Sequence, residues 1–229
     1  MTTPFTDQNA GVKESIDKFI VDMMVLIGSQ KGGAGKSTLA MLLANYLAGN
    51  RSQRVALLDL DPQHAIDMIA KKAKVLENEP PYQVWPVDIE NFDFVLKRIH
   101  QLPVEMIIVD MPAEMINERL RAIIQQAQVI ICPFNYDLLT LQPTIQYALL
   151  VGKINTNIKQ LFIPNRIKSN VTYDTRTDIE NILKRLGIVV PALADRIAFQ
   201  RINTQHTPST LIPVVNPVLD LIYECYLRK

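Results

Sequence analysis

The chain has 229 residues, of which 48% are hydrophobic and 21% are charged. This composition excludes a disordered protein and supplies the apolar residues for a substantial core. No apolar run reaches the roughly 18 residues that a membrane span needs, and residues 1–10 lack the layout of a signal peptide, so we expect a cytoplasmic protein. Two cysteines, Cys132 and Cys225, are too few and too far apart to indicate a disulfide framework or a metal site.

The net charge of +1 is unevenly distributed along the chain. Residues 1–150 carry 13 Lys/Arg and 17 Asp/Glu, a net charge of −4, whereas residues 151–229 carry 11 and 6, a net charge of +5. A basic C-terminal third can attract the phosphate backbone of a nucleic acid. The alternative interpretation is an ordinary solvated surface of mixed charge.

The N-terminal residues 1–22 are expected to lie outside the repeating pattern of the rest of the chain. Residues 1–10 are typical of a flexible tail. Apolar residues recur at helical spacing from Val12 to Met23, which predicts a short amphipathic helix before the first strand. We expect this helix to pack on the core, with a role in a dimer contact as the alternative.

Strands and helices alternate from Met24 onward. The expected strands cover residues 24–27, 55–59, a short stretch around Val84, 106–110, 129–133, 161–164 and 188–190. The expected helices cover residues 39–47 (ending near Gly49), 64–76, 92–99, 116–126, 138–151 with Pro143 in the first turn, 172–186 closed by Gly187, and a last helix from about Pro217. Repeated βα units with apolar strands predict an α/β fold with a doubly wound, mainly parallel sheet flanked by helices. We find no repeat or linker and expect one domain over residues 1–229.

A glycine-rich run connects the first predicted strand to the first predicted helix. It reads Lys31-Gly32-Gly33-Ala34-Gly35-Lys36-Ser37-Thr38. The glycines let successive backbone N–H groups point at phosphate oxygens, and the new helix adds its N-terminal partial positive charge. Lys36 supplies a charge for the β- and γ-phosphates, and Ser37 supplies a hydroxyl for Mg²⁺. The glycine that usually opens such a loop is replaced by Gln30, and a second lysine, Lys31, follows it.

Three acidic residues follow predicted strands, at the edge of the sheet where a ligand binds. Asp59 ends one strand, Asp61 lies two residues further, and Asp110 ends another. Phosphoryl transfer needs Mg²⁺ held in place and a water aligned with the γ-phosphate. Asp110 fits a metal-binding role, Asp59 is a further candidate metal ligand, and Asp61 is our candidate for orienting the water. A lone aspartate at a strand end is more often only a helix cap or a turn residue.

Several motifs together resemble those of the ParA/MinD family of P-loop ATPases. The glycine-rich run resembles that family's deviant Walker A motif, and Asp59-Leu60-Asp61-Pro62-Gln63 resembles its D-x-D-P-Q motif. Asp110-Met111-Pro112-Ala113 is similar to its D-x-P-P switch, although Ala113 replaces the second proline. Asn165-Arg166 is similar to its adenine-contacting pair, and the run from Tyr173 to Thr177 resembles a segment of its partition ATPases. These matches extend from Met24 to about Arg201.

The resemblance implies a P-loop ATPase fold, ATP and Mg²⁺ as cofactors, and a homodimer that forms when ATP binds. Lys31 would be the signature lysine that reaches the partner subunit's ATP, much as an arginine finger stabilises a transition state. Lys36 would contact the β- and γ-phosphates and Thr38 the α-phosphate, while Asn165 and Arg166 would bind the adenine. The alternatives are a solvated loop lysine for Lys31 and a simple turn residue for Asn165.

The resemblance to small partition ATPases also implies partners. Such proteins bind DNA without sequence preference as ATP dimers, and a centromere-binding, ParB-like adaptor stimulates their hydrolysis. We therefore expect nucleoid association. Non-specific DNA binding needs several basic residues on one face. The candidates are Lys153, Lys159, Lys168, Arg176, Lys184, Arg185, Arg196 and Arg201.

Other functions remain as alternatives. A MinD-like protein would bind a membrane through a C-terminal amphipathic helix, but the apolar stripe of residues 217–229 favours core packing. A positioner of a protein cargo would use the same ATPase with another adaptor. A regulator that does not hydrolyse ATP is disfavoured by the presence of Lys36, Asp61 and Asp110. An iron–sulfur reductase would need well-placed cysteines that the chain lacks.

Overall fold

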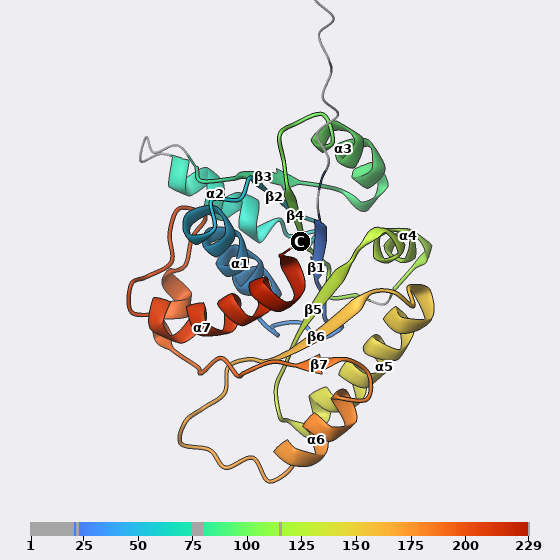
Figure 1. Ribbon diagram of the computed structural model, residues 1–229, viewed down its shortest axis with the longest axis vertical. Helices are drawn as coiled ribbons and strands as arrows, with labels where there is room; N and C mark the ends of the chain where they lie inside the picture. The colour runs from blue at the N-terminus through green and yellow to red at the C-terminus, as the bar shows by residue number, and fades with distance from the viewer. Residues whose placement is uncertain (1–20, 22, 75–79, 115, 229) are drawn as a thin grey trace, which may run out of the picture.

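A parallel β-sheet forms the centre of the protein (Figure 1). The computed structural model describes residues 21, 23–74, 80–114 and 116–228. Within these residues seven strands pair in the order β3-β2-β4-β1-β5-β6-β7, each parallel to its neighbours. The strands are β1 (Met23–Ile27), β2 (Val55–Asp59), β3 (Gln83–Pro86), β4 (Met106–Asp110), β5 (Val129–Phe134), β6 (Lys159–Pro164) and β7 (Ile188–Val189). The predicted doubly wound parallel sheet is confirmed.

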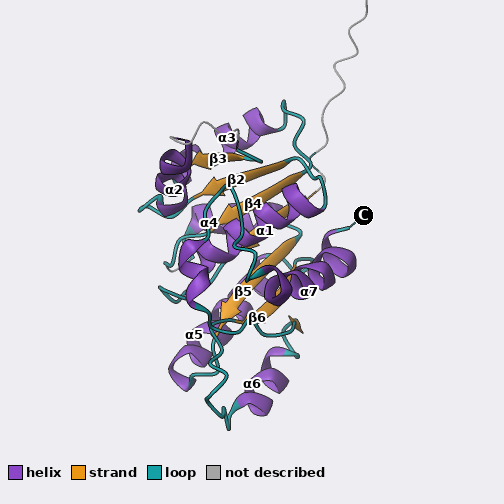
Figure 2. Ribbon diagram, turned by 90° about the vertical axis from the view of Figure 1, so that its left-hand side faces the viewer, coloured by secondary structure: helices purple, strands orange, loops and turns teal. Residues whose placement is uncertain are grey.

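The helices cover both faces of this sheet. They are α1 (Lys36–Asn50), α2 (Ala65–Lys74), α3 (Phe92–Ile99), α4 (Glu118–Gln126), α5 (Leu138–Ile154), α6 (Arg176–Leu183) and α7 (Ile212–Ile222). Helices α1, α2 and α7 pack in one hydrophobic cluster, and α3 to α6 pack in another on the opposite face. Figure 2 shows the strands passing between α7 on one side and α5 on the other. Because both faces are covered, β2, β4 and β5 are buried at every residue, which explains their continuous apolar runs.

The central strand β1 positions the site. It pairs with β4 on one side and β5 on the other, so that Ile27 lies opposite Asp110 and Ile131. All the strands point the same way, and the loops that follow them meet at one edge, which we call the carboxyl edge. The loop after β1 therefore lies between the loops after β4 and β5, at the position where open α/β sheets bind ligands.

The C-terminal helix begins earlier than the sequence predicts. Helix α7 begins at Ile212, with Pro213 in its first turn, and Pro217 lies inside it rather than at its start. Proline inside a helix removes one backbone hydrogen bond. The burial of Val218 and Leu219 against the core compensates for that loss. Five further residues, Tyr223–Leu227, continue it as one π-helical turn.

Three smaller expectations also need correction. Pro143 lies well inside α5 and not in its first turn. Helix α6 is shorter than residues 172–186, and the chain just before it is held beyond the end of β5, where the Thr175 hydroxyl donates to the backbone carbonyl of Tyr136. Met23 begins β1 instead of ending a helix.

Two expected features lie outside the described residues. These are the flexible tail and short helix of residues 1–22, apart from residue 21, and the end of the helix predicted to reach Leu76. In the described part of the chain, no helix combines the length and apolar character that crossing a bilayer requires.

Candidate nucleotide-binding site

The glycine-rich loop joins β1 to α1, and its backbone conformation requires glycine at specific positions. Gly33 and Gly35 have φ angles of 73° and 91°, in the left-handed region that other residues rarely adopt. Gly28 is needed for space, since a Cβ there would lie 2.3 Å from the Tyr147 hydroxyl oxygen. The loop thus passes closely over α5 and turns sharply into α1, leaving Lys31 exposed to solvent.

Lys36 is the first residue of α1, and its side chain is only 6% exposed. Burial lowers the pKa of its ammonium group, and the negative charges of Asp110 and Asp61 partly oppose that effect. Lys36 therefore lies close enough to Asp110 and Asp61 to feel their charges. A buried cation at a helix N-terminus is well placed to bind a phosphate group.

Asp110 ends β4 and is completely buried. Burial, helped by the negative charges of Asp59 and Asp61 and opposed by Ser37 and Lys36, raises the pKa of its carboxyl to about 7. Within the described residues neither carboxylate oxygen accepts a hydrogen bond of good geometry, although the Ser37 hydroxyl is close. Buried polar atoms are normally paired. The unpaired carboxylate beside a serine hydroxyl therefore fits a divalent cation.

Asp59 shares this buried position but has a second role. It lies opposite Asp110 in the β2–β4 register. Its Oδ2 accepts hydrogen bonds from the backbone N–H groups of Ile66 and Asp67, at 3.0 and 3.1 Å, and so holds the start of α2. Its Oδ1 is buried without a partner in the described structure. The helix-cap interpretation holds for one oxygen, and the other is free to face a cation.

Asp61 lies in a tight turn beyond β2. Its Oδ1 accepts the backbone N–H of Gln63 at 3.0 Å, and its carbonyl accepts that of His64 at 2.8 Å. Its side chain is half-buried and lines a cavity of about 410 Å³, together with the loop residues Lys36 to Thr38 and Ala113. The turn therefore directs a carboxylate into the space above the glycine-rich loop. Of the residues predicted for the phosphate end, Lys36, Ser37, Thr38 and Asp61 meet at this cavity.

No three acidic, histidine or cysteine side chains of the described chain come together as a ready-made metal site. Mg²⁺ commonly uses only one or two protein carboxylates and takes its other ligands from water and substrate phosphates. Ser37, Asp110 and the free oxygen of Asp59 fit that pattern.

A second cavity, of about 430 Å³, continues from the first. The two share Gly35, Thr38 and Arg166. The second is closed on its far side by the segment after β7, which includes Arg196, Ile197 and Phe199. A nucleotide with its phosphates on the loop has room for its base here. No motif in the sequence points to Ile197, which is 79% exposed and offers an apolar surface beside this cavity.

Asn165 and Arg166, the predicted adenine contacts, line this second cavity but also hold the loop itself. The side-chain amide of Asn165 donates to the carbonyl of Ala34 at 2.9 Å. The guanidinium of Arg166 donates to the carbonyl of Gly33 at 2.9 Å. These bonds fasten the glycine-rich loop to the end of β6. The pair therefore supports the loop in addition to any contact with a base.

The eight basic candidates for DNA binding do not share one face. Lys168, Arg176, Arg196 and Arg201 lie on segments that follow β6 and β7, at the carboxyl edge. Lys153, Lys159, Lys184 and Arg185 lie where α5 and α6 return to the start of the next strand, at the opposite edge. Two of them are also paired with Glu180, namely Arg176 at 2.9 Å and Lys184 at 3.6 Å. Any single DNA-binding surface uses one subset of the eight.

The parallel sheet, the glycine-rich loop after its central strand and the acidic residues at the neighbouring strand ends define an α/β protein of the P-loop nucleotide-binding class. Residues 25–208 match the model of the CobQ/CobB/MinD/ParA nucleotide-binding domain, and the chain belongs to this family.

Similar proteins include both partition and cell-division proteins. A "Protein ParA" of Rhizobium radiobacter is 27% identical over 184 residues, covering 77% of this chain and 80% of that protein. The crystal structure of a Borrelia burgdorferi B31 protein described as a plasmid partition protein, bound to AMPPNP, is 21% identical with a TM-score of 0.70, covering 89% of this chain and 99% of that one. MinD, a cell division protein of Aquifex aeolicus, is 19% identical with a TM-score of 0.67, covering 90% and 98%. At these identities the two structures establish the fold.

Proposed function

We propose that this protein is a slow ATPase that hydrolyses ATP to ADP and phosphate and acts in the partition of plasmid or chromosomal DNA. The observation that carries the proposal is the buried, unpaired carboxylate of Asp110 close to Lys36 and Ser37, two residues that line a cavity together with Asp61. Membership of a nucleotide-binding family and the similarity to a ParA protein support it.

Each residue has a defined task in this proposal. Mg²⁺, when bound with ATP, would neutralise charge on the phosphates, and Ser37, Asp110 and the free oxygen of Asp59 would hold it. Lys36 binds the β- and γ-phosphates with its buried ammonium. Asp61 accepts a hydrogen bond from the attacking water and aligns it with the γ-phosphate, since positioning supplies most of the catalysis in phosphoryl transfer.

In this proposal, Lys31 completes the nucleotide-binding site of a second subunit. It belongs to the same loop as the phosphate-binding residues, yet its side chain is exposed. An exposed lysine beside a bound triphosphate is available to a facing subunit, where its charge would stabilise both the dimer and the transition state. ATP binding would thus create the dimer, and hydrolysis would dissolve it.

The ATP dimer would bind DNA without sequence preference, associate with the nucleoid, and respond to a centromere-binding, ParB-like adaptor. Dimerisation doubles whichever subset of basic residues faces the DNA, which makes weak binding depend on ATP. The carboxyl-edge subset of Lys168, Arg176, Arg196 and Arg201 is the better candidate. It lies on the same side as the nucleotide cavities, and Arg196 lines one of them.

Two variants test the ATPase and the dimer separately. Asp61→Ala should abolish DNA-stimulated ATP hydrolysis while leaving ATP binding intact, and Asp178→Ala, an exposed aspartate on α6, serves as the matched control. Lys31→Ala should remain monomeric with ATP in size-exclusion chromatography under conditions where the wild type dimerises. Equal hydrolysis by Asp61→Ala and wild type refutes the water-positioning role, and equal dimer formation by Lys31→Ala refutes the role of the lysine.

Binding assays with DNA and with liposomes test whether the protein associates with DNA or with a membrane. The apolar face of α7, including Val218, Leu219 and Ile222, is buried in the core, so it is not available to a membrane in this conformation. We expect an ATP-dependent shift of DNA that weakens steeply with salt. ATP-dependent sedimentation with liposomes, without a DNA shift, would instead favour a MinD-like role.

A further inference from the structure

A group of basic residues lies at the edge of the sheet where the strands begin, which we call the amino edge. Lys159 is the first residue of β6, and Lys153 lies in the last turn of α5. Lys184 and Arg185 follow directly on the end of α6. All four are exposed, and we call them the amino-edge cluster. The cluster is on the opposite edge of the sheet from the nucleotide cavities, so nothing in the proposed ATPase site uses it.

One buried glutamine, Gln160, brings the three segments of the cluster together. It is the second residue of β6. A Cβ on Gly152 of α5 would lie 3.2 Å from its Nε2, and a Cβ on Gly187, just after α6, would clash with its carbonyl oxygen. The end of α5 and the chain after α6 therefore both touch the start of β6. The four basic residues come from backbone segments that meet at one place.

Acidic residues are absent from the segments around the cluster. Residues 138–173 and 181–194 contain no aspartate or glutamate. Lys184 shares Glu180 with Arg176, at 3.6 and 2.9 Å. The other three members of the cluster form no ion pair with any residue that the structure describes. The amino edge of β6 therefore keeps an excess of positive charge facing solvent.

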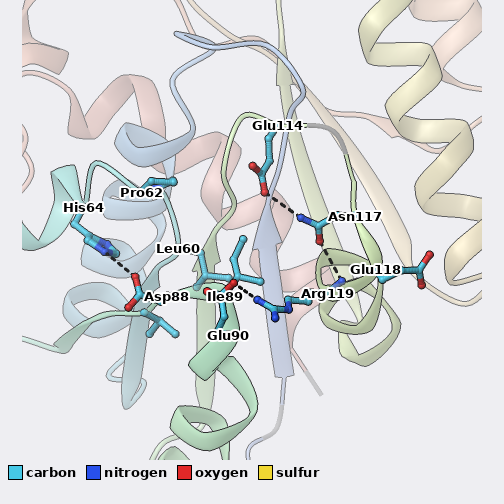
Figure 3. Close-up of a pocket in the computed structure, with 11 residues that line it drawn as sticks. Leu60, Pro62, His64, Asp88, Ile89, Glu90, Glu114, Asn117, Glu118 and Arg119 are labelled. Carbon is cyan, nitrogen blue, oxygen red and sulfur yellow. Dashed lines mark hydrogen bonds and ion pairs between the residues drawn. The ribbon is translucent and has the colours of Figure 1, made fainter.

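Several acidic residues of the protein gather at the other end of the sheet. Figure 3 shows them around a groove beside the segments that follow β3 and β4, namely Asp88, Glu90, Glu114 and Glu118. Strands β4, β1 and β5 separate this groove from β6. The acidic groove is therefore too far away to neutralise the cluster within one molecule.

Helix dipoles account for only part of the cluster. The C-terminal end of a helix attracts cations, and α5 and α6 both end at the amino edge. However, Lys159 begins a strand and is not at a helix end. Helices α1 and α4 end at the same edge, and neither has a basic residue in its last turn. Complementing helix ends therefore does not explain why basic residues gather around β6.

Two exposed apolar side chains lie next to these charges. Leu149 is 47% exposed and lies one helical turn before Lys153 on α5. Ile182 is 37% exposed, and its carbonyl accepts the backbone N–H of Arg185 at 3.1 Å. Residues three or four positions apart lie on the same face of a helix. Figures 1 and 2 both show α5 and α6 side by side. Their outer surface therefore combines positive charge with apolar area.

We propose that the amino-edge cluster, with Leu149 and Ile182, is a docking surface for an acidic segment of a partner protein that also carries apolar side chains. The carboxylates of the segment pair with the cluster, and its apolar side chains cover Leu149 and Ile182. Because the surface lies away from both nucleotide cavities, the segment binds with or without nucleotide. This docking does not rest on the proposed ATPase function.

The combination of charge and apolar area selects a protein segment as the occupant. The phosphates of a nucleic acid would pair with the cluster but would leave Leu149 and Ile182 in water. A segment with both kinds of side chain satisfies both parts, because complementary charge sets the rate and specificity of docking and apolar contact supplies buried area. Residues 1–20 of this chain carry three acidic residues and two lysines, so their charge does not match four basic residues.

Fluorescence anisotropy with three labelled octapeptides at low salt tests the docking surface. The peptides alternate Glu with Leu, Glu with Ser, and Arg with Leu. The first should bind the wild type, the second more weakly and the third not at all, with the same affinities in the presence and absence of AMPPNP. The double variant Lys153→Glu/Arg185→Glu should bind the Glu–Leu peptide about tenfold or more weakly.

Two further double variants separate charge from apolar contact. Lys72→Glu/Lys97→Glu makes the same change of charge in the last turns of α2 and α3, and it should bind as the wild type does. Leu149→Ser/Ile182→Ser should weaken the Glu–Leu peptide and leave the Glu–Ser peptide unchanged. Circular dichroism should show all the variants folded.

Several results would overturn the proposal. One is equal affinity of Lys153→Glu/Arg185→Glu and the wild type for the Glu–Leu peptide, or an equal loss in Lys72→Glu/Lys97→Glu. Another is duplex DNA or phosphatidylglycerol vesicles that bind without nucleotide and are lost in Lys153→Glu/Arg185→Glu, while the peptide does not bind. A third is a concentration-dependent oligomer without nucleotide that this variant abolishes, since the surface would then take a second copy of the chain. None of these measurements requires ATP hydrolysis, so failure of the proposed ATPase leaves the docking surface standing.

Discussion

The buried carboxylate of Asp110 makes the stability of the ligand-free protein depend on pH, and Asp110→Asn should remove that dependence. The pKa of Asp110 rises from about 3.8 to about 7 in the folded protein, mainly through burial. The folded state therefore keeps a proton that the unfolded chain has already lost between pH 4 and pH 7, so the free energy of unfolding falls as pH rises through this range. At about 1.36 kcal/mol per pKa unit the full effect is about 4 kcal/mol, of which about 3 kcal/mol falls between pH 5 and pH 8.

Urea denaturation measures this effect directly. Trp85, the single tryptophan, lies on β3 and reports unfolding by its fluorescence. An asparagine side chain is neutral at both pH values, so the stability of Asp110→Asn relative to wild type should be about 3 kcal/mol more favourable at pH 8 than at pH 5. The quantity to compare is the change in relative stability between pH 5 and pH 8, because any cost of burying the amide that does not depend on pH cancels in it. Asp178→Asn, which alters an exposed carboxylate, should show no such change.

A stability difference between Asp110→Asn and wild type that is the same at pH 5 and pH 8 would refute the reasoning. It would mean that the carboxyl is ionised at both pH values, with its charge balanced by Lys36 and Ser37. A cation would then not be needed to balance the charge of the carboxylate. The carboxylate of Asp110 would then no longer mark a site for Mg²⁺.

Three further substitutions test particular contacts. Gly28→Ala should destabilise the protein strongly because its Cβ would meet the Tyr147 hydroxyl, and Tyr147→Phe in the same chain should restore part of the loss in a double-mutant denaturation series. Asn117→Ala should cost about 1 kcal/mol by thermal melting, because Asn117 accepts the backbone N–H groups of Arg119 and Leu120 at the start of α4. Arg166→Gly and Arg166→Ala should both weaken nucleotide binding, by isothermal calorimetry, through loss of the contact with the loop. The glycine variant should be the more stable by about 1 kcal/mol, since residue 166 has a φ of 57°.

Much of the fold was predictable because its strands carry local signals. The strands around Asp59 and Asp110 are short apolar runs that end in a carboxylate, and they fold with the predicted bounds. The start of α7 was not predictable in this way. Pro217 normally marks a helix start, but tertiary packing of Val218 and Leu219 outweighs that local preference.

The candidate site was predictable where a motif places its own residues and not where separate segments meet. The loop from Lys31 to Thr38 fixes the phosphate end by itself. In contrast, the bond between Asn165 and the carbonyl of Ala34 joins positions far apart in the sequence. The basic residues are divided between two edges because of the direction in which α5 and α6 run. The number of Lys and Arg residues in a segment does not reveal that direction. The exposed Ile197 belongs to no motif at all.

The short outer strands of the sheet restrict how copies of this protein can assemble. The edge strands β3 and β7 have four and two residues, so they offer few free backbone groups for another strand to pair with. Growth of the sheet from molecule to molecule, which would be hard to reverse, is therefore disfavoured. Any self-association would have to rely on side chains and loops instead, and contacts of that kind are readily broken.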